Sequence, residues 1–556
     1  MNFYLQKNIK FNKKEYTIIL VLVLCLPMYL YNTFLDFYID DAALYALLSK
    51  NMLQSGDFFS LIHNHKDWLD KPHFPFWITI FFYKIMGVKS FSYMLPITLA
   101  IFTSFLYTYK FANKYYDKKT ALLSVFILAT SQYVFLASTE GRIEPYIMLS
   151  IIAAVYHFDK GFFEKKTIHL VLMTIFVAIA IMTKGVFIVI AIFGAIFGHF
   201  FFEKYSIKNL LNWRWVFIFS LIILFILPEI IALYIQYDRN SSENFFEEKT
   251  VSALKWFLWD SQFSRLINSG IITRANGNPF FFLHTLIWAF FPWAIVLYFT
   301  FFIKIKQIVH KKVTTEMYTF FGGFLMLIIF SISKFQLPHY ISIVFPFFSI
   351  LIAGNLGVSF SKAQQVIINY SQIIFIFFGI FLILFLSIIS KNGFQIAAFS
   401  IIVFVLNCLY LFKKKLSNSL KLIFLSGSTA ILVNFYFSLT IFPKIIEYKG
   451  GINAAKYLNK TSKPKLVATI GKVPNLFDFY SDSNTIKYKK IDENIVINAD
   501  FVLTHLADSI SKSIVLKDYE VVKIFPHYDS ENIDLYFLNP TKRNKHLSEF
   551  ILYKRK

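Results

Sequence analysis

The sequence has little charge and almost no cysteine. Only 16% of its 556 residues are Asp, Glu, Lys or Arg, whereas soluble domains carry roughly 25%, so most of the chain belongs in lipid. The two cysteines, Cys25 and Cys408, both lie inside apolar runs, which excludes a disulfide framework and a cysteine-based zinc site. No small-residue cleavage site follows the basic N-terminal stretch. We therefore expect a retained cytoplasmic tail and first span rather than a cleaved signal peptide.

Long apolar runs are the most prominent feature of the sequence. Hydrophobic residues account for 56% of the chain, and the mean hydropathy is +0.55. About thirteen runs are long enough to cross a bilayer, which predicts an α-helical polytopic membrane protein. The runs lie near residues 17–36, 92–109, 120–138, 143–158, 168–182, 186–202, 215–235, 283–303, 317–333, 339–357, 367–389, 395–412 and 420–442.

The basic residues indicate how the chain is oriented. The net charge of +23 forms no continuous face for nucleic acid, because Lys and Arg gather in short clusters between apolar runs. With the N-terminus in the cytoplasm, the inner connections are rich in Lys and the short outer ones carry one cation each. We therefore expect a protein of the cytoplasmic (inner) membrane whose odd number of spans places the C-terminus outside.

Two long outer loops and a C-terminal region interrupt this pattern. Loops as long as 37–91 and 236–282 are usually functional. The first contains a helix-period stretch from Leu44 to Met52 and the run FPFWITIFFYKIMG, expected at the interface or re-entrant. Beyond a transmembrane domain over 1–446, we expect a small α/β domain outside the membrane over 447–556. Its strand-like runs are LVATIG, ADFVLT, YEVVKIF and DLYFLN, its expected helix is INAAKYLNK, and it carries no motif that would assign it a chemistry.

Polar residues stand at the outer ends of the apolar runs in a recognisable order. Asp40 and Asp41 follow the first run, where a charge pair is costly unless water, a cation or a reaction uses it. The series continues with Tyr45, Ser55-Gly56-Asp57, Asp70-Lys71-Pro72, Trp77, Arg142-Ile143-Glu144-Pro145, Thr183-Lys184-Gly185, Arg239, Arg265, Arg274, Asn278-Pro279, Pro292-Trp293, Ser333-Lys334 and Leu337-Pro338-His339-Tyr340.

This series resembles the polyprenyl-phosphate-dependent glycosyltransferases of the GT-C class. The nearest branch is that of the lipid A aminoarabinose transferase, a relative of the protein O-mannosyltransferases. The family pattern of two acids and a Tyr, then Ser-Gly-Asp, then Glu-Lys-Pro, matches without gaps when its first acid falls on Asp41. The second acid becomes Ala42, Glu-Lys-Pro becomes Asp70-Lys71-Pro72, and Glu144 stands where many relatives have Asp. The metal-associated histidine of the aminoarabinose branch falls near Asn276 or Gln262.

The resemblance implies a GT-C fold and a sugar donor joined through phosphate to a long isoprenoid. The leaving phosphate needs cations to neutralise its charge more than it needs an acid to protonate it. The candidates for holding it are Lys71, Arg265, Arg274 and Lys334, with Tyr340. The sugar passes through an oxocarbenium-like state while a carboxylate deprotonates the acceptor. Asp41 is the expected base, Asp40 and Glu144 are further catalytic candidates, and a single displacement inverts the anomeric carbon. The remaining site candidates are Asp70, Arg142, Tyr45, Lys184 and His339.

Each of these residues also has a structural alternative. Asp40 and Asp41 suit a helix N-cap, and Lys71 suits an extension toward lipid headgroups. The further structural alternatives are an ion pair between Arg142 and Glu144, an outer turn anchored by Lys184, and interfacial positions for His339 and Tyr340. No metal is assigned, although His63, His65 and His73 with Asp70 leave a divalent cation open.

We therefore expect an inverting glycosyltransferase that moves a sugar from a polyprenyl-phosphate donor to a lipid, protein or glycan acceptor at the outer membrane face. One alternative is a transporter or flippase of lipid-linked sugars, which would place charges in mid-span and break helices in matched halves. Another is a binding or assembly module in which the C-terminal domain is the working part.

Overall fold

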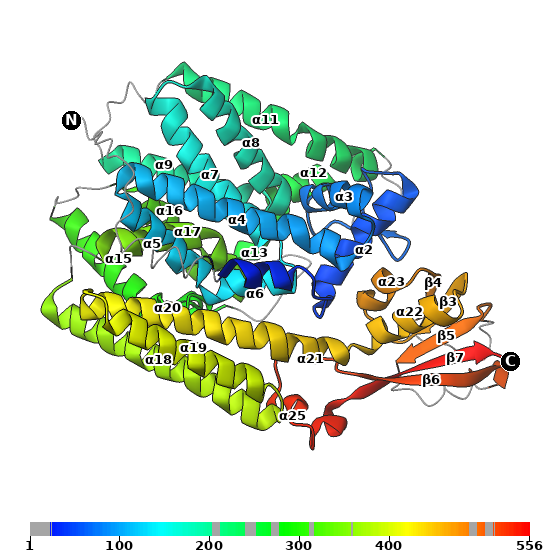
Figure 1. Ribbon diagram of the computed structural model, residues 1–556. Helices are drawn as coiled ribbons and strands as arrows, with labels where there is room; N and C mark the ends of the chain where they lie inside the picture. Colours follow the sequence, from blue (N-terminus) through cyan, green and yellow to red (C-terminus); the bar gives the residue numbers. More distant parts are fainter. Residues whose placement is uncertain are drawn as a thin grey trace.

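The computed structural model describes residues 23, 25–202, 212–239, 252–267, 277–310, 316–356, 360–488, 497–505, 515 and 517–556, without the side chains of residues 262 and 265. Helices form one large body, and a small sheet domain lies at one end of it (Figure 1). The expected fold class, a polytopic helical protein with a C-terminal α/β domain, is confirmed.

The helical body begins with helical residues 25–32. Its elements in chain order are α2 (Asp40–Ser55), β1 (Ile62–His63), β2 (Lys66–Asp67), α3 (Phe74–Met86), α4 (Ser90–Tyr115), α5 (Lys118–Ala129), α6 (Gln132–Glu140), α7 (Glu144–Phe163), α8 (Thr167–Lys184), η1 (Val186–Ile188), α9 (Val189–Phe202), α11 (Trp213–Leu233), η2 (Tyr234–Asp238), α12 (Ala253–Lys255), η3 (Trp256–Asp260), α13 (Ser261–Ile267), α14 (Phe281–Ala289), α15 (Ala294–Val309), α16 (Tyr318–Ile332), η4 (Pro338–Val344), α17 (Phe345–Asn355), α18 (Lys362–Ser390), α19 (Phe394–Phe412), α20 (Asn418–Tyr436), η5 (Phe437–Ile441) and α21 (Phe442–Glu447).

Several of the expected spans are broken or short. Among the described residues, seven helices are long and apolar enough to cross a membrane, or eight if the bent pair α5–α6 is one span. That pair bends by 53° at Thr130-Ser131. The expected span 283–303 is instead two helices, α14 and α15, separated at Phe290–Trp293, where Pro292 offers no backbone N–H to continue the ladder. The expected total of thirteen spans stays a prediction.

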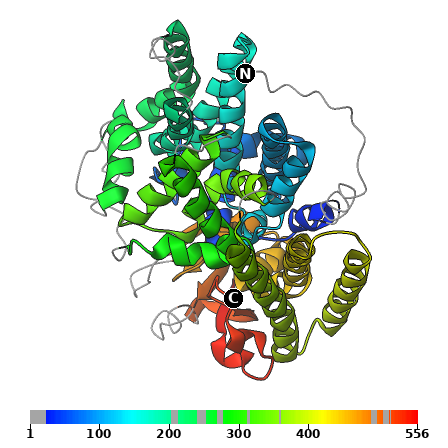
Figure 2. The ribbon, with the colours of Figure 1, turned by 90° about the vertical axis from the view of Figure 1, so that its left-hand side faces the viewer.

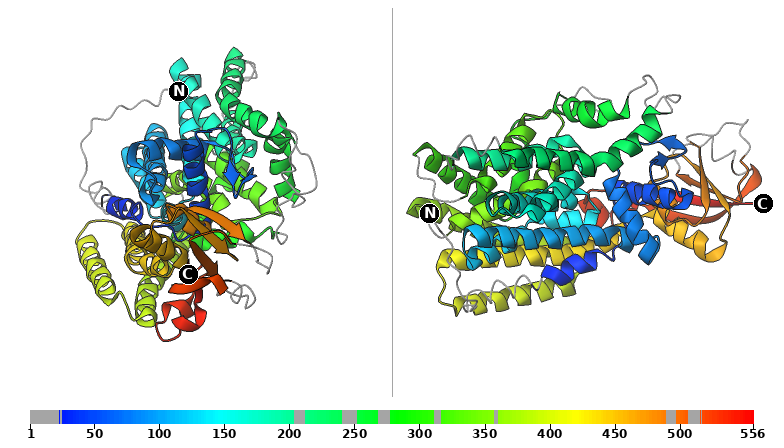
Figure 3. Two further views of the ribbon diagram at one scale, coloured as in Figure 1. Left: turned by 90° about the vertical axis from the view of Figure 1, so that its right-hand side faces the viewer. Right: turned by 90° about the horizontal axis from the view of Figure 1, so that it is seen from above.

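The pair α18 and α19 is the most lipid-like part of the body. Only 33% and 17% of their apolar stretches are buried inside the protein, although both are strongly hydrophobic. Figures 2 and 3 show this pair at one side of the helical body. Large apolar side chains that face outward all along a helix are those expected against lipid tails.

The C-terminal domain is a five-stranded mixed sheet with helices packed on it. The strand order is β4 (Asn484–Tyr488), β3 (Leu466–Ile470), β5 (Phe501–His505), β7 (Ser548–Arg555) and β6 (Tyr519–His527). Strand β3 is parallel to β4 and β5, and β7 is antiparallel to β5 and β6. Apolar side chains of α22 (Gly450–Thr461) and α23 (Asn475–Tyr480) pack with one face of the sheet. Two short helices, α25 (Leu535–Leu538) and η6 (Arg543–His546), precede β7.

Most elements expected in this domain are present, with one exception. LVATIG, ADFVLT and YEVVKIF supply β3, β5 and β6, and INAAKYLNK supplies α22. DLYFLN, expected as a strand, forms the short helix α25, so that expectation was wrong. The side chain of Asp534 accepts a hydrogen bond from the backbone N–H of Tyr536 at 2.9 Å, and this local cap favours a helical turn over an extended run of four apolar residues.

Candidate active site

Polar residues from widely separated parts of the chain meet in one cavity. Its volume is about 170 Å³. The lining comes from the first turns of α2, the segment before α3, the turn between α6 and α7, the end of α8 and the segment that leads into η4. The lining residues are Asp41, Tyr45, Asp70, Lys71, Arg142, Ile143, Glu144, Lys184, Phe335, Leu337, His339 and Tyr340. Most of the residues proposed from the sequence are therefore brought together.

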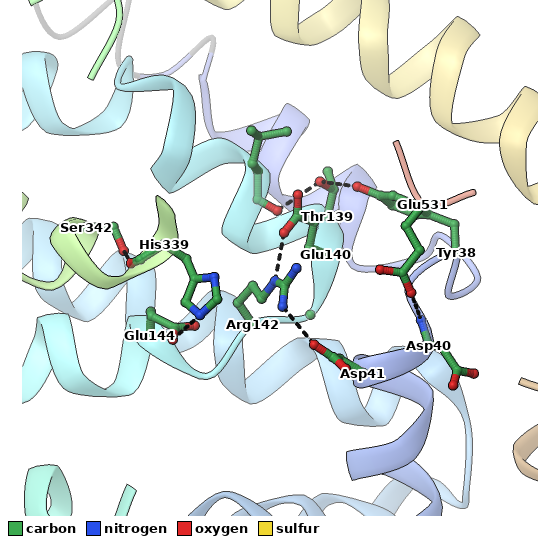
Figure 4. Close-up of polar contacts among 12 residues, drawn as sticks. Tyr38, Asp40, Asp41, Thr139, Glu140, Arg142, Glu144, His339, Ser342 and Glu531 are labelled. Carbon is green, nitrogen blue, oxygen red and sulfur yellow. Dashed lines mark hydrogen bonds and ion pairs between the residues drawn. The ribbon is translucent and has the colours of Figure 1, made fainter. Parts of the chain in front are cut away.

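Asp41 faces the cavity and is held from one side by Arg142. The guanidinium Nη1 of Arg142 lies 3.1 Å from Oδ2 of Asp41, and its Nε donates to Glu140 at 2.8 Å (Figure 4). Burial lowers the pKa of Arg142, but the neighbouring Glu140 carboxylate outweighs it and raises the pKa well above the usual value, so the cation is permanent. The Asp41 side chain is 60% exposed and lines the cavity, and Arg142 contacts only one of its two oxygens.

The turn that presents Arg142 requires glycine. Gly141 adopts φ +65°, in the left-handed region, and caps the end of α6. A Cβ placed there would lie 3.0 Å from the Cβ of Ala42 and 3.0 Å from the ring of Tyr93. The turn therefore packs directly against α2, which fixes the distance between Arg142 and Asp41.

Glu144 forms a different ion pair from the one considered as its structural alternative. Its Oε1 lies 2.5 Å from Nζ of Lys184 and 3.6 Å from Nε2 of His339, whereas Arg142 turns toward Glu140 and Asp41. The Glu144 and Lys184 side chains are each only 4% exposed. Lys184 also lies 4.1 Å from the centre of the Tyr340 ring. Lys184 is therefore held in a buried ion pair between α8 and α7, and a charge pair this deeply buried is costly to form.

Lys71 connects the cavity to a second, smaller pocket. It forms an ion pair with Asp70 and is 14% exposed. The small pocket, of about 20 Å³, adds Glu229 of α11 and Trp256 to a lining that also contains Lys71 and Lys184. Lys71 and Lys184 thus line both the cavity and the small pocket, so an anionic group bound there would contact both cations.

Burial and nearby charge tune two further residues. Burial, and then the Asp70 and Asp41 carboxylates, raise the pKa of Tyr45 well above its usual value, so its hydroxyl stays a hydrogen-bond donor. Asp40 lies outside the cavity lining and turns toward the C-terminal domain (Figure 4). Burial raises its pKa, while hydrogen bonds from Leu476 and Asn475 oppose that shift.

One further candidate from the sequence, Lys334, does not line the cavity. Lys334 is exposed, and its backbone pairs with Gly277 and Leu266. Arg274 and the side chain of Arg265 lie outside the described residues, as do Asn276 and the side chain of Gln262.

Two of the histidines considered for a metal, His63 and His73, have other partners. His63 contacts Asn475, and Nδ1 of His73 lies 2.9 Å from Glu229. Among the described residues, no three His, Cys, Asp or Glu gather as metal ligands.

Sequence reasoning missed the buried contact between His73 and Glu229. Both oxygens of Glu229 are engaged, one by the backbone N–H of His73 at 2.9 Å and one by its ring at 2.9 Å, and both side chains are 0% exposed. This contact ties the segment that carries Lys71 to α11. A carboxylate inside the apolar run FILPEIIAL was the signal that marked Glu229, because such residues in spans are rare and usually functional.

Comparison with known proteins supports the same class. The family model for dolichyl-phosphate-mannose-protein mannosyltransferase matches residues 70–231. An undecaprenyl phosphate-alpha-4-amino-4-deoxy-L-arabinose arabinosyl transferase from Wigglesworthia glossinidia brevipalpis is 25% identical over 476 residues, which cover 80% of this chain and 78% of that protein. An uncharacterized protein from Aquifex aeolicus is 27% identical over 546 residues, covering 96% of this chain and 98% of that one.

Solved structures agree in fold. The crystal structure of ArnT from Cupriavidus metallidurans bound to undecaprenyl phosphate superposes with a TM-score of 0.70 at 14% identity, over 96% of this chain and 97% of that one. The resemblance to the GT-C glycosyltransferases is confirmed. An oligosaccharyltransferase from Archaeoglobus fulgidus matches with a TM-score of 0.51 at 13% identity, over 85% of this chain and 64% of that one. The chain is thus a multi-span membrane protein with a fold of the GT-C type, and the relative of named activity and the solved structures that it resembles are glycosyltransferases.

Proposed function

We propose that the protein is an inverting glycosyltransferase that uses a polyprenyl-phosphate-linked sugar. The donor class rests on the ArnT relatives, one of which was crystallised with undecaprenyl phosphate. The acceptor is a lipid, protein or glycan hydroxyl. The cavity opens to the outer face of the cytoplasmic membrane, with the N-terminus in the cytoplasm and the C-terminal domain outside. This orientation rests on the distribution of Lys and Arg between the apolar runs.

Lys71 and Lys184 hold the donor phosphate. They line both the cavity and the adjoining small pocket, so one phosphate group can meet both cations. As the bond between the anomeric carbon and the phosphate oxygen breaks, its electron pair leaves with polyprenyl phosphate. The ammonium groups stabilise the added negative charge, which is where fixed cations lower a barrier most. Tyr340 packs against Lys184 and keeps that ammonium in place.

Asp41 acts as the base. The acceptor oxygen attacks the anomeric carbon from the face opposite the phosphate, and its proton passes to the Asp41 carboxylate. Each carboxylate has one oxygen in an ion pair, but Asp41 suits this role better because its side chain is 60% exposed, whereas that of Glu144 is only 4% exposed. A single displacement of this kind inverts the anomeric configuration.

The observation that carries the proposal is the cavity itself, where three carboxylates and three cations from distant segments meet. The test uses purified protein in lipid nanodiscs with undecaprenyl-phosphate-linked sugars and a membrane extract as acceptor. We expect release of undecaprenyl phosphate coupled to sugar transfer, and weaker donor binding in Lys71→Met. Lys414→Met is the matched control, because Lys414 lies over the Tyr410 ring, away from the cavity.

The transporter alternative predicts a different result. In proteoliposomes, the intact donor would cross the bilayer without cleavage of its sugar–phosphate bond. That outcome would overturn the proposed function.

A further inference from the structure

The helix that carries Asp41 has no N-terminal cap of its own. Ile39 occupies the N-cap position of α2 and offers no side-chain hydrogen bond. The first helical N–H, that of Asp40, donates instead to Oε1 of Glu531 in the C-terminal domain at 2.7 Å (Figure 4). Unsatisfied N–H groups at a helix start need such an acceptor. The cap of α2 is therefore supplied from a residue 491 positions away in the sequence.

The converse also holds for α23 of the C-terminal domain. Pro474 is its N-cap residue and makes no side-chain cap. The Asp40 carboxylate accepts from the backbone N–H of Leu476 at 3.3 Å and from Nδ2 of Asn475 at 2.8 Å. Each helix start is thus satisfied by a carboxylate from the other unit.

The far end of α23 is held by the same helix. Nζ of Lys50 donates to the backbone oxygens of Asp478, Phe479 and Ser481 at 3.2, 3.1 and 2.7 Å. Asp40 is the first residue of α2 and Lys50 lies ten residues further along it, so α2 offers a carboxylate to the start of α23 and an ammonium to its end. This arrangement matches the polarity of the helix and fixes α23 along α2.

The segment that leads into α2 is held by the same domain. The backbone N–H of Phe37 donates to the hydroxyl of Tyr480 at 2.9 Å, and its ring packs against Phe479 and Tyr93. Asp36 forms an ion pair with Lys456 at 2.5 Å. The chain from residue 36 to the first turn of α2 therefore has few ways to move independently of the domain.

We propose that Asp40 is a positioning residue, through which the C-terminal domain fixes the first turn of α2 so that Asp41 faces Arg142 and the cavity. Neighbouring residues of a helix point about 100° apart, so the two acids have separate directions and separate tasks. This inference rests on the proposed function, in which Asp41 is the base. The C-terminal domain, to which the sequence assigned no chemistry, then becomes part of the active-site framework.

The test compares Asp40→Asn and Glu531→Ala with the matched control Asp534→Asn, all in the full-length protein. Asn places an amide opposite the Asn475 amide, and Ala removes the cap of α2. Glu531 is exposed, so its truncation leaves the core of the domain unchanged. Asp534 also caps a short helix of the domain but contacts Tyr536, not α2.

We expect Asp40→Asn and Glu531→Ala to lower kcat about ten-fold or more, because small misplacements of a reacting group are costly, with the KM for the donor unchanged. The control should keep the wild-type kcat. In an Asp41→Asn background neither substitution should lower kcat further, because residues that act as a unit are not additive.

Three outcomes would overturn the inference. They are a wild-type kcat in both variants, an equal loss in the control, or the same proportional loss in the Asp41→Asn background. Failure of the proposed function is recognised separately. If Asp41→Asn alone keeps the wild-type kcat, Asp41 is not the base and there is nothing for Asp40 to position.

Discussion

Replacing Lys184 with Met should destabilise the protein by isolating the charge of Glu144. The two side chains lie 2.5 Å apart and are each 4% exposed, so solvent does not screen the pair. Removing one partner of a buried pair costs about 3–5 kcal/mol. His339, at 3.6 Å from the same oxygen, offers partial compensation, which places the expected loss near the lower end, about 3 kcal/mol. Denaturant unfolding of the purified protein in detergent measures this difference.

The double variant Glu144→Gln with Lys184→Met separates stability from activity. It leaves no unpaired charge, so most of the lost free energy of unfolding should return, while sugar transfer should not, because the phosphate loses one of its cations. A Lys184→Met variant as stable as the wild type would refute the reasoning. So would a double variant that is as unstable as the single one.

Further predictions concern the frame around the cavity. Glu229→Gln should loosen the segment that carries Lys71 and raise the KM for the donor more than it lowers kcat; a change in kcat alone would contradict this. Gly141→Ala should cost about 1–2 kcal/mol from its left-handed backbone, before the 3.0 Å contacts are counted, and an unchanged unfolding midpoint would argue against the tight turn. Single cysteines at Asn64 and Ser530 should both react with an impermeant reagent from outside; labelling of either from the cytoplasm only would reverse the proposed orientation.

The convergence of the site could be predicted because its residues stand at the ends of apolar runs. The spans bring the ends of the runs on one membrane side to the same level. We could therefore expect Asp41, Lys71, Glu144 and Lys184 to lie close together, as they do. The pairing between them could not be predicted. Whether Arg142 turns toward Glu144 or toward Asp41 depends on the turn at residue 141 and on where α7 begins, and no periodicity encodes that.

Long-range contacts account for most of what the sequence left open. Asp40 was a catalytic candidate because it adjoins Asp41, yet its partners lie more than 430 positions away in a domain whose docking has no sequence signature. The contact between His73 and Glu229 spans 156 positions. The carboxylate inside an apolar run marks Glu229, but nothing in the sequence identifies His73 as its partner. Locally, the strand expected at DLYFLN failed because a run of four apolar residues fits a helical turn as well as a strand, and the Asp534 cap decides between them.

The rate of sugar transfer by Asp41→Asn tests the central claim most directly. The amide keeps the size of the side chain, so donor binding and folding should persist while the base is lost. With undecaprenyl-phosphate-linked sugar at saturation, and Asp534→Asn as the control, we predict a rate about 10² to 10⁴ lower than wild type, against a wild-type rate in the control. A wild-type rate from Asp41→Asn, with the anomeric configuration of the product still inverted, would show that the acceptor proton leaves by another route and would contradict the assignment of Asp41.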